Sequence, residues 1–334
     1  MYYAPQLAIG GVQYDGVDVH YAAQRYLSDE LHAARLPFWT PYIFSGFPFL
    51  ADLQVGAGYP LNWPFFALGV MPRSLSLELL LHSLVACIGA YALAWRLLRS
   101  KLAALAAAVF YGLSGYFAAH AQHIGMSQAA AWLPWLVLLF LVAMERLSLR
   151  LVAIAALLGA MLALPGSFQI ALYAFCGASL WALADAGTTA RARRGLAALM
   201  AVGVGGALLA AVMILPAAEL ASQSIRTELD ARSVNLGYFH PDSLLTLVWP
   251  DYYGLLSGSY HGPGDSTQHY FYGGLLLVPL AVVGVRDPRI RRLAALLALP
   301  FLWYALGPIG GLFRLVVRLP GFSSVELPMH GWFL

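Results

Sequence analysis

Two aspartates lie three residues apart near the start of the sequence, in the stretch Tyr14-Asp-Gly-Val-Asp-Val-His20. A carboxylate can act as a general base that takes the proton of a hydroxyl group while the hydroxyl oxygen attacks a carbon atom. Asp15 could fill that role, and Asp18 could orient the hydroxyl or share a divalent cation with Asp15. The alternative is that both are solvated loop residues beside the flexible Gly16. Taken alone, the residue types favour this plainer alternative.

The composition indicates what kind of structure must position these aspartates. Hydrophobic residues make up 60% of the 334 residues, charged residues only 10%, and the mean hydropathy is +0.71. Soluble domains carry about 25% charged residues, and a soluble fold could not bury so much apolar surface, whereas a bilayer can. We therefore expect an all-α membrane protein with several spans. No basic run is interleaved with aromatic residues, so nucleic acid is not an expected partner.

Apolar runs predict eight membrane spans. They cover roughly residues 75–97, 102–119, 128–145, 151–165, 167–185, 195–216, 270–285 and 293–308. The fourth and eighth are short, since a spanning helix takes about 20 apolar residues, so each could be broken, re-entrant or tilted. Pro165 and Gly166 leave little room between the fourth and fifth spans and predict a tight hairpin there. Cys87 and Cys176 lie inside apolar runs, where we expect buried free thiols.

Basic residues gather in four short connections between these spans. Cytoplasmic loops are enriched in Lys and Arg, so these connections are expected to face the cytoplasm. They hold twelve of the nineteen Lys and Arg residues and none of the nine histidines: Arg96, Arg99, Lys101, Arg146, Arg150, Arg191, Arg193, Arg194, Arg286, Arg289, Arg291 and Arg292. The long segments 1–74, 217–269 and 309–334 then lie outside the cell, and the two aspartates lie with them.

The two ends of the sequence suggest that it is part of a longer protein. Segment 1–74 contains no signal peptide, and a polar segment of this length does not cross a membrane unaided. We therefore expect a missing helix ahead of Met1. The sequence stops at Gly331-Trp-Phe-Leu334 without closing an element, so we also expect a truncated C-terminus. The expected parts are an outer loop 1–74, six spans in 75–216, an outer loop 217–269, two spans in 270–308 and an outer tail 309–334.

This orientation limits the substrates. Nucleotide-activated donors are cytoplasmic, and the cytoplasmic connections are short, without a glycine-rich turn between strand and helix that could cradle a phosphate. The run Gly203-Val-Gly-Gly206 lies inside the sixth span, where small residues serve close helix packing. An enzyme with this topology needs a donor that reaches the outer face of the membrane. A lipid-linked donor meets that condition.

Residues 36–64 carry a pattern rich in proline and tryptophan, which follows an acidic residue and leads to a glutamine and a Tyr-Pro pair. The residues concerned are Asp15, Pro37, Trp39, Pro41, Tyr42, Gly46, Pro48, Gln54, Tyr59 and Pro60. Shorter motifs follow at Leu113-Ser-Gly115, Ala131-Trp-Leu-Pro134, Gly166-Ser-Phe-Gln169, Ser224-Ile-Arg226, Tyr272-Gly273 and Leu319-Pro-Gly321. In this pattern the chain resembles YfhO-like bacterial membrane proteins, which are relatives of the GT-C glycosyltransferases.

The resemblance implies a GT-C-like helix bundle in the bacterial plasma membrane with its active site on the extracytoplasmic face. The implied activity moves a sugar from a polyprenyl-phosphate donor to an outer-face acceptor such as a cell-wall polymer, with Asp15 as the catalytic base. It also implies a helix ahead of the first outer loop. The chain departs from the family at Glu326, where an arginine usually precedes the Leu-Pro pair, and in its shorter length.

Five further residues are candidates for binding the substrate: Arg226, Gln169, Gln54, Trp39 and His20. The guanidinium of Arg226 could hold the phosphate of the leaving group through two parallel hydrogen bonds, or it could reach to lipid headgroups. The amide of Gln169 could bind sugar hydroxyls or cap a helix end, and its match to the family's Gly-x-x-Gln motif favours the sugar.

Other ionisable residues have plainer interpretations. His120 and His123 could face one side of a helix, but a metal ion needs further ligands that the spacing does not supply, so we expect interfacial histidines. Glu78 and His82 are expected to satisfy each other close to the headgroups. Prolines stiffen the aromatic stretch 38–66, which we interpret as a scaffold over the outer membrane surface.

Two other functions compete with a transferase. A transporter or flippase for the same lipid would place charged or broken-helix sites near the membrane midplane, and here the centres of the spans are nearly free of charge. A non-catalytic partner of a glycosylation system would have no active site, and the Glu326 departure is compatible with it. Movement of labelled lipid without product would favour the transporter.

Overall fold

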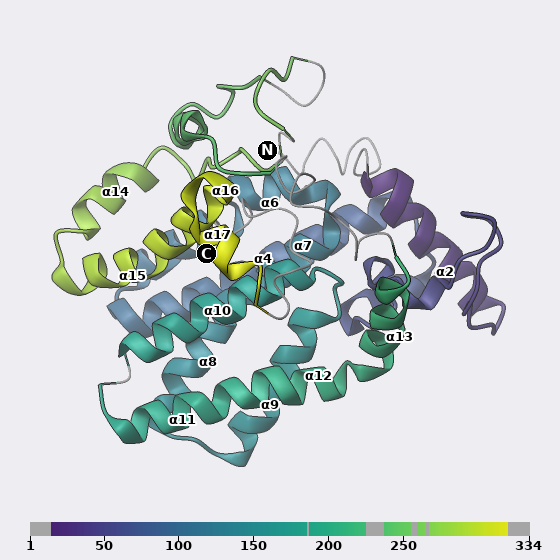
Figure 1. Ribbon diagram of the computed structural model, residues 1–334, viewed down its shortest axis with the longest axis horizontal. Helices are drawn as coiled ribbons and strands as arrows, with labels where there is room; N and C mark the ends of the chain where they lie inside the picture. The colour runs from purple at the N-terminus through teal and green to yellow at the C-terminus, as the bar shows by residue number, and fades with distance from the viewer. Residues whose placement is uncertain (1–14, 186, 225–236, 255–258, 265–266, 320–334) are drawn as a thin grey trace.

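The part of the chain that the structure describes is mainly helical. The computed structural model describes residues 15–185, 187–224, 237–254, 259–264 and 267–319. Within these ranges there is no β-strand, and one isolated antiparallel bridge joins Thr40 and Phe47. The helices pack into one bundle, with residues 15–32 at the right of the view and the helices of residues 277–316 at its upper left and centre (Figure 1).

Four helical stretches are long and apolar enough to cross a membrane among the residues described: Pro72–Leu98, Lys101–Gln122, Ile124–Glu145 and Thr189–Leu209. Their regular parts are α4 (Pro72–Leu98), α5 (Lys101–Gly112), α6 (Gly115–Ala119), α7 (Ile124–Ala130), α8 (Leu133–Glu145), α11 (Thr189–Met200) and α12 (Gly206–Leu209). A polypeptide can satisfy its backbone in hydrocarbon as a helix, so these stretches make the protein an all-α, membrane-embedded one.

The other main helices are each shorter than the about 20 residues that a spanning helix takes. They are α9 (Leu149–Ala163), α10 (Phe168–Asp185), α13 (Ala211–Ser222), α14 (Leu277–Gly284) and α15 (Pro288–Ala305). The expected span 195–216 is divided among α11, a π-helical turn at Ala201–Gly205, α12 and α13. The expected span 270–285 is helical only from Leu277, because residues 270–276 form an irregular connection. The number of eight spans therefore stays a prediction.

The first expected outer loop contains a helix of its own. A π-helical turn at Gly16–Tyr21 continues into α2 (Ala22–His32), and α3 (Trp63–Leu68) follows several 3₁₀ turns later. The outer region between α13 and α14 contains the 3₁₀ helix at Pro241–Leu247, and α16 (Gly307–Gly310) and α17 (Leu312–Val316) follow α15. The polar character of segment 1–74 concealed α2, whose residues are helix formers with few apolar side chains.

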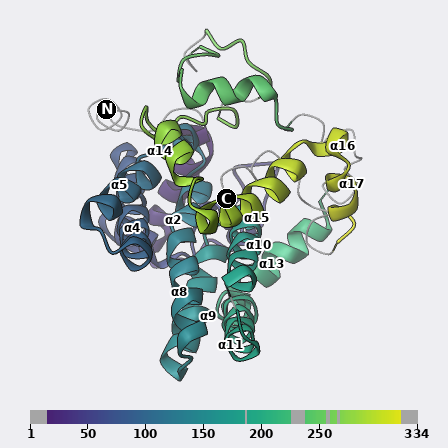
Figure 2. The same cartoon turned by 90° about the vertical axis from the view of Figure 1, so that its left-hand side faces the viewer.

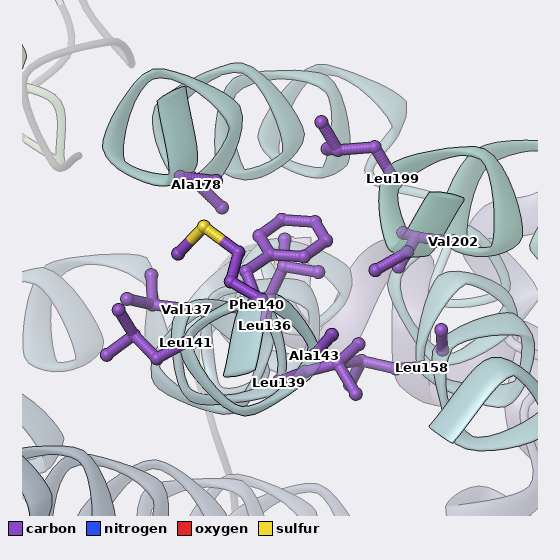
Figure 3. Packing of buried hydrophobic residues seen from close by; sticks show 14 of the residues in the cluster. Leu136, Val137, Leu139, Phe140, Leu141, Ala143, Leu158, Ala178, Leu199 and Val202 are labelled. Carbon is purple, nitrogen blue, oxygen red and sulfur yellow. The ribbon is translucent and has the colours of Figure 1, made fainter. Parts of the chain in front are cut away.

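Helix α8 is the centre of the main hydrophobic core. Leu136, Phe140 and Met144 are buried along it and pack against residues of α9, α10 and α11. Figure 3 shows the α8 side chains beneath Ala178 and Leu199. Burial of such side chains stabilises each by about 1.5–3 kcal/mol relative to exposure, although within lipid the gain comes from packing rather than from leaving water.

Three of the four basic connections meet at one end of the bundle. Arg96 at the end of α4 lies 2.5 Å from the carboxylate of Glu145, the last residue of α8. The guanidinium of Arg194 on α11 donates to the backbone oxygens of Met144, at 3.2 Å, and Glu145. Figure 2 shows α8, α9 and α11 extending together away from the rest of the chain. This clustering agrees with the expectation that the basic connections face the same side of the membrane.

Glycines bring α9 and α12 into direct backbone contact. A Cβ atom on Gly159 would overlap the carbonyl oxygen of Val202, and one on Gly206 would lie 2.6 Å from the backbone carbon of Gly159. Gly203, in the same stretch as Gly206, is different because a Cβ there would meet only the Phe175 ring at 3.8 Å.

We expect Gly159→Ala to lower the thermal-unfolding midpoint of the protein in detergent, since an overpacked methyl group costs about 1–3 kcal/mol. Gly203→Ala is the matched control. It should keep the midpoint or raise it, because alanine favours a helix by up to about 1 kcal/mol over glycine. Equal midpoints for the two variants would contradict the close contact of α9 and α12.

Candidate functional site

Asp15 and His123 lie against each other at the end of the α7–α8 span that is remote from Glu145. A carboxylate oxygen of Asp15 is 3.5 Å from Nε2 of His123. Asp15 stands immediately before the π-helical turn, and His123 immediately before α7. The Asp15 side chain is 57% exposed, so the pair is open to a ligand from outside the protein.

His20 lies beneath this pair and is buried. The π-helical turn directs His20 inward while Asp18 stays on the exposed side. Burial, with a smaller effect of nearby His123, lowers the pKa of His20 to about 4, against the opposing effects of a hydrogen bond with the Gln54 backbone and of Asp15. His20 is therefore a neutral imidazole at neutral pH. Asp15, His123 and the backbone of Gln54 all lie close enough to His20 to affect its pKa.

His120 extends this group into the protein. It is fully buried, and its ring stacks on Tyr116 with centroids 4.3 Å apart and lies 5.7 Å from the His123 ring. Its Nδ1 donates to the backbone oxygen of Tyr116 at 3.0 Å. The expectation of an interfacial histidine is therefore wrong for His120, because the chain turns inward after α6 and places the ring in the core.

A buried carboxylate lies below this group, on α4. Glu78 is completely buried, and its Oε2 accepts hydrogen bonds from the amide nitrogens of Gln24 at 3.1 Å and Gln128 at 3.4 Å. The Gln128 amide also donates to Oδ1 of Asn62 at 2.8 Å. These four side chains come from α2, α4, α7 and the turn before α3. Glu78 is the acceptor at which α2 and α7 meet α4.

His82 continues the network on the next turn of α4. Its Nδ1 lies 2.6 Å from the backbone oxygen of Glu78, so this nitrogen donates and Nε2 accepts from the Tyr59 hydroxyl at 2.8 Å. The Trp132 indole N–H donates to the same hydroxyl oxygen at 2.9 Å. Burial raises the pKa of Tyr59, which keeps its hydroxyl proton available to His82. Glu78 and His82 thus do not pair through their side chains, contrary to expectation.

The network fixes the segment that carries the aspartates. Gln24 follows His20 by four residues. The hydrogen bond from Gln24 to Glu78 therefore holds α2, and with it the π-helical turn, against the first turns of α4. Two further contacts support α2: Ser28 donates to the backbone oxygen of Phe66 at 2.9 Å, and Arg25 to that of Val70 at 3.0 Å.

The other predicted site residues have mixed outcomes. Gln54 has its side chain exposed, and its backbone N–H donates to Asp52 at 2.9 Å. The Gln169 amide donates to the Tyr173 hydroxyl at 3.0 Å, and that hydroxyl contacts Tyr304 at 3.2 Å. Gly166 packs against the backbone of Leu53 and Gln54, which brings the α9–α10 turn towards the first outer segment.

Two predictions have no described contact at this place, and a third, Arg226, stays untested. Trp39 is exposed and belongs to a hairpin, where its indole ring lies against Gly46. Arg226 lies outside the described residues. Among the residues described, no group of three or more His, Cys, Asp or Glu side chains could hold a metal ion, so a cation shared by Asp15 and Asp18 has no support there.

Sequence reasoning missed the partners that complete the site. His123 was expected only at an interface, while Gln24, Asn62 and Gln128 were not singled out. Gln128 carried a signal, because an amide inside the apolar run 124–145 needs a buried partner. Gln24 carried none, because it lies in a polar segment where glutamine is ordinary.

Comparisons with protein-family models, with curated proteins and with solved structures find no match to this chain.

Glu78→Leu should destabilise the protein, because it leaves the Gln24 and Gln128 amides without their acceptor, at about 1–3 kcal/mol for each unsatisfied group. Glu78→Gln should stay close to the wild type, since its amide can accept from Gln24 and donate to the unpartnered Gln24 Oε1. Thermal unfolding in detergent measures both. A leucine variant as stable as the wild type would show that the network does not hold α2.

The low pKa of His20 predicts a pH-dependent loss of stability. The unfolded chain, with an ordinary histidine pKa of about 6.5, takes up the proton first, so the contribution of His20 is lost as pH falls from about 6.5 towards 4. The unfolding midpoint of His20→Gln should therefore fall less than that of the wild type between about pH 7 and about pH 5. His261→Gln, which changes an exposed histidine, should retain the wild-type slope. Identical slopes for all three proteins would contradict the burial of His20.

Proposed function

We propose that this protein is a glycosyltransferase that moves a sugar from a polyprenyl-phosphate donor to an acceptor hydroxyl on the outer face of the bacterial plasma membrane. The observation that carries the proposal is the exposed carboxylate of Asp15, 3.5 Å from His123 and above the neutral, buried His20. Asp15 is also the residue to which the sequence resemblance assigns the catalytic base.

The reaction needs one base and one stabilised leaving group. The acceptor hydroxyl oxygen forms a bond to the anomeric carbon, the bond from that carbon to the phosphate oxygen breaks, and the phosphate leaves with the bonding electrons. The hydroxyl proton passes to Asp15. A neighbouring imidazole such as His123 can orient the carboxylate and share its proton, as histidine–carboxylate pairs do in general acid–base catalysis. Attack opposite the leaving group inverts the sugar.

The position of the pair suits a donor that is embedded in the membrane. His123 and Glu145 stand at opposite ends of the 22-residue stretch Ile124–Glu145, which spans about 33 Å as a helix. Glu145 belongs to the basic end, which the distribution of Arg and Lys assigns to the cytoplasm. Asp15 then faces the outer leaflet, where a lipid-linked sugar and a cell-wall acceptor can both arrive.

Two residues are proposed to bind the donor. Gln169 follows the turn that packs on Leu53 and Gln54, so a sugar near Asp15 could be within reach of its amide oxygen while the amide nitrogen binds Tyr173. Arg226 is proposed to hold the phosphate, on the basis of the sequence pattern alone. Trp39 is not included, because its surroundings support a different role.

Asp15→Asn should lower transfer in proteoliposomes by about a hundredfold or more, because general base catalysis contributes about 10²–10⁴ to the rate. Insertion and thermal stability should be unchanged, since the side chain is largely exposed. Glu30→Gln is the matched control: it removes another carboxylate of the same segment, which is partly exposed and pairs with Arg35, and should retain activity.

Two results would contradict the proposal. One is wild-type turnover by Asp15→Asn. The other is movement of labelled polyprenyl-phosphate sugar across the vesicle membrane by the wild type without any glycosylated product, which would assign the protein to the transporters.

A further inference from the structure

A hairpin of residues 36–47 projects from the bundle after α2, and we call it the aromatic hairpin. It is the purple loop to the right of α2 in Figure 1. Its large apolar side chains are mostly exposed: Phe44 is 85% exposed, and Tyr42 is 80% exposed although its ring meets that of Tyr26 with centroids 5.9 Å apart. The exposed set is Leu36, Phe38, Trp39, Tyr42, Ile43 and Phe44.

The sequence of the hairpin is unlike that of a loop in water. Between Arg35 and Asp52 there is no Asp, Glu, Lys, Arg or His. Exposed loops are normally polar, and a contiguous apolar patch marks a surface that contacts lipid or another molecule. The mixture of Trp, Tyr, Phe and Pro with a single Thr and a single Ser is the composition found at membrane–water interfaces.

The hairpin holds these side chains outward in a fixed conformation. Thr40 and Phe47 exchange two backbone hydrogen bonds, of 2.9 and 2.8 Å, and the Gly46 N–H donates to Ile43 at 2.8 Å. Phe44 and Ser45 have φ angles of 51° and 61°, in the left-handed region that costs non-glycine residues energy. The Trp39 ring covers Gly46, where a Cβ would lie 2.5 Å from the ring. A preformed tip loses little conformational entropy when it is buried.

The base of the hairpin lies at the level where α4 begins. Nε2 of His32, the last residue of α2, is 3.1 Å from the backbone oxygen of Ala67, and Arg25 reaches the backbone of Val70. α4 begins two residues after Val70, at Pro72. The exposed side chains of Leu68 and Met71 lie along the chain between these points. The hairpin is thus tied to the outer end of a spanning helix.

We propose that the aromatic hairpin is a membrane anchor, whose tip at Tyr42, Ile43 and Phe44 inserts into the outer leaflet of the bilayer that α4 spans. Arg35, at the base and 65% exposed on its side chain, lies at headgroup level beside Glu30, with which it pairs at 2.7 Å. The tip has no charge to desolvate, so its insertion avoids the large cost that a charged side chain carries in a membrane.

Other occupants fit the tip less well. A sugar would need amide or carboxyl partners around the stacking rings, and residues 36–51 contain none. A second copy of this chain or another protein would cover the tip without lipid, and the experiment separates that case. The proposal does not depend on the glycosyltransferase function, since it concerns only contact with the bilayer.

The test uses the full chain in lipid vesicles, in a background with Cys87→Ser and Cys176→Ser so that one thiol can be labelled. A fluorophore on Ile43→Cys should be quenched by lipids brominated on their acyl chains and protected from aqueous iodide. The matched control is Asp29→Cys, an exposed position on α2, where iodide should quench and brominated lipid should not. The variant Tyr42→Ser/Phe44→Ser should reduce quenching at position 43 by brominated lipid at least twofold, with an unchanged unfolding midpoint in detergent.

Two results would overturn the anchor. Iodide quenching at position 43 equal to that at position 29 would place the tip in water. Protection from both quenchers would place it against protein. If Ile43→Cys does not fold, the intrinsic tryptophan fluorescence of Trp39→Phe compared with the parent chain gives the same comparison, because Trp39 sits beside the tip.

Discussion

The buried carboxylate of Glu78 is the interaction on which the outer part of this protein depends. It accepts hydrogen bonds from Gln24 and Gln128, and through them it joins α2 and α7 to α4. A buried acceptor of this kind is costly without partners, so the hydrogen bonds to Glu78 favour the observed arrangement of the three helices. That arrangement sets the position of the π-helical turn, and therefore where Asp15 meets His123. The proposed chemistry at Asp15 therefore depends on the hydrogen bond between Gln24 and Glu78, which positions the helix that follows Asp15.

The two ends of the bundle have opposite chemistry. At one end, Arg96 and Arg194 meet Glu145 and the backbone beside it, in a cluster of exposed and half-buried charges. At the other, neutral donors and acceptors such as His82 and Tyr59 form a buried network with no cation in it among the described contacts. Charged groups therefore gather at one end of the bundle, while a buried hydrogen-bond network that includes the Glu78 carboxyl group occupies the other.

The sequence predicts the parts of this structure that depend on local composition. Apolar runs locate α4, α5 and α8, and the basic connections indicate their common end. Glu78 could be recognised as a residue that needs a partner, but the partner could not be identified, because Gln24 lies 54 residues away in a segment with no distinguishing pattern. The inward turn of His120 and the π-helical turn depend on tertiary packing. The proline- and aromatic-rich stretch predicted a stiff surface element, while the outward direction of Phe44 follows from backbone angles that composition does not reveal.

The glycine contact between α9 and α12 limits where a lipid chain can lie against the protein. Where Gly159 meets Val202 and Gly206, the two backbones touch and leave no gap wide enough for a hydrocarbon chain. A lipid chain cannot enter between α9 and α12 at this point while the two helices stay in contact. The lipid tail of the proposed donor would therefore lie along another side of the bundle, and a search for bound lipid can leave out the line between α9 and α12.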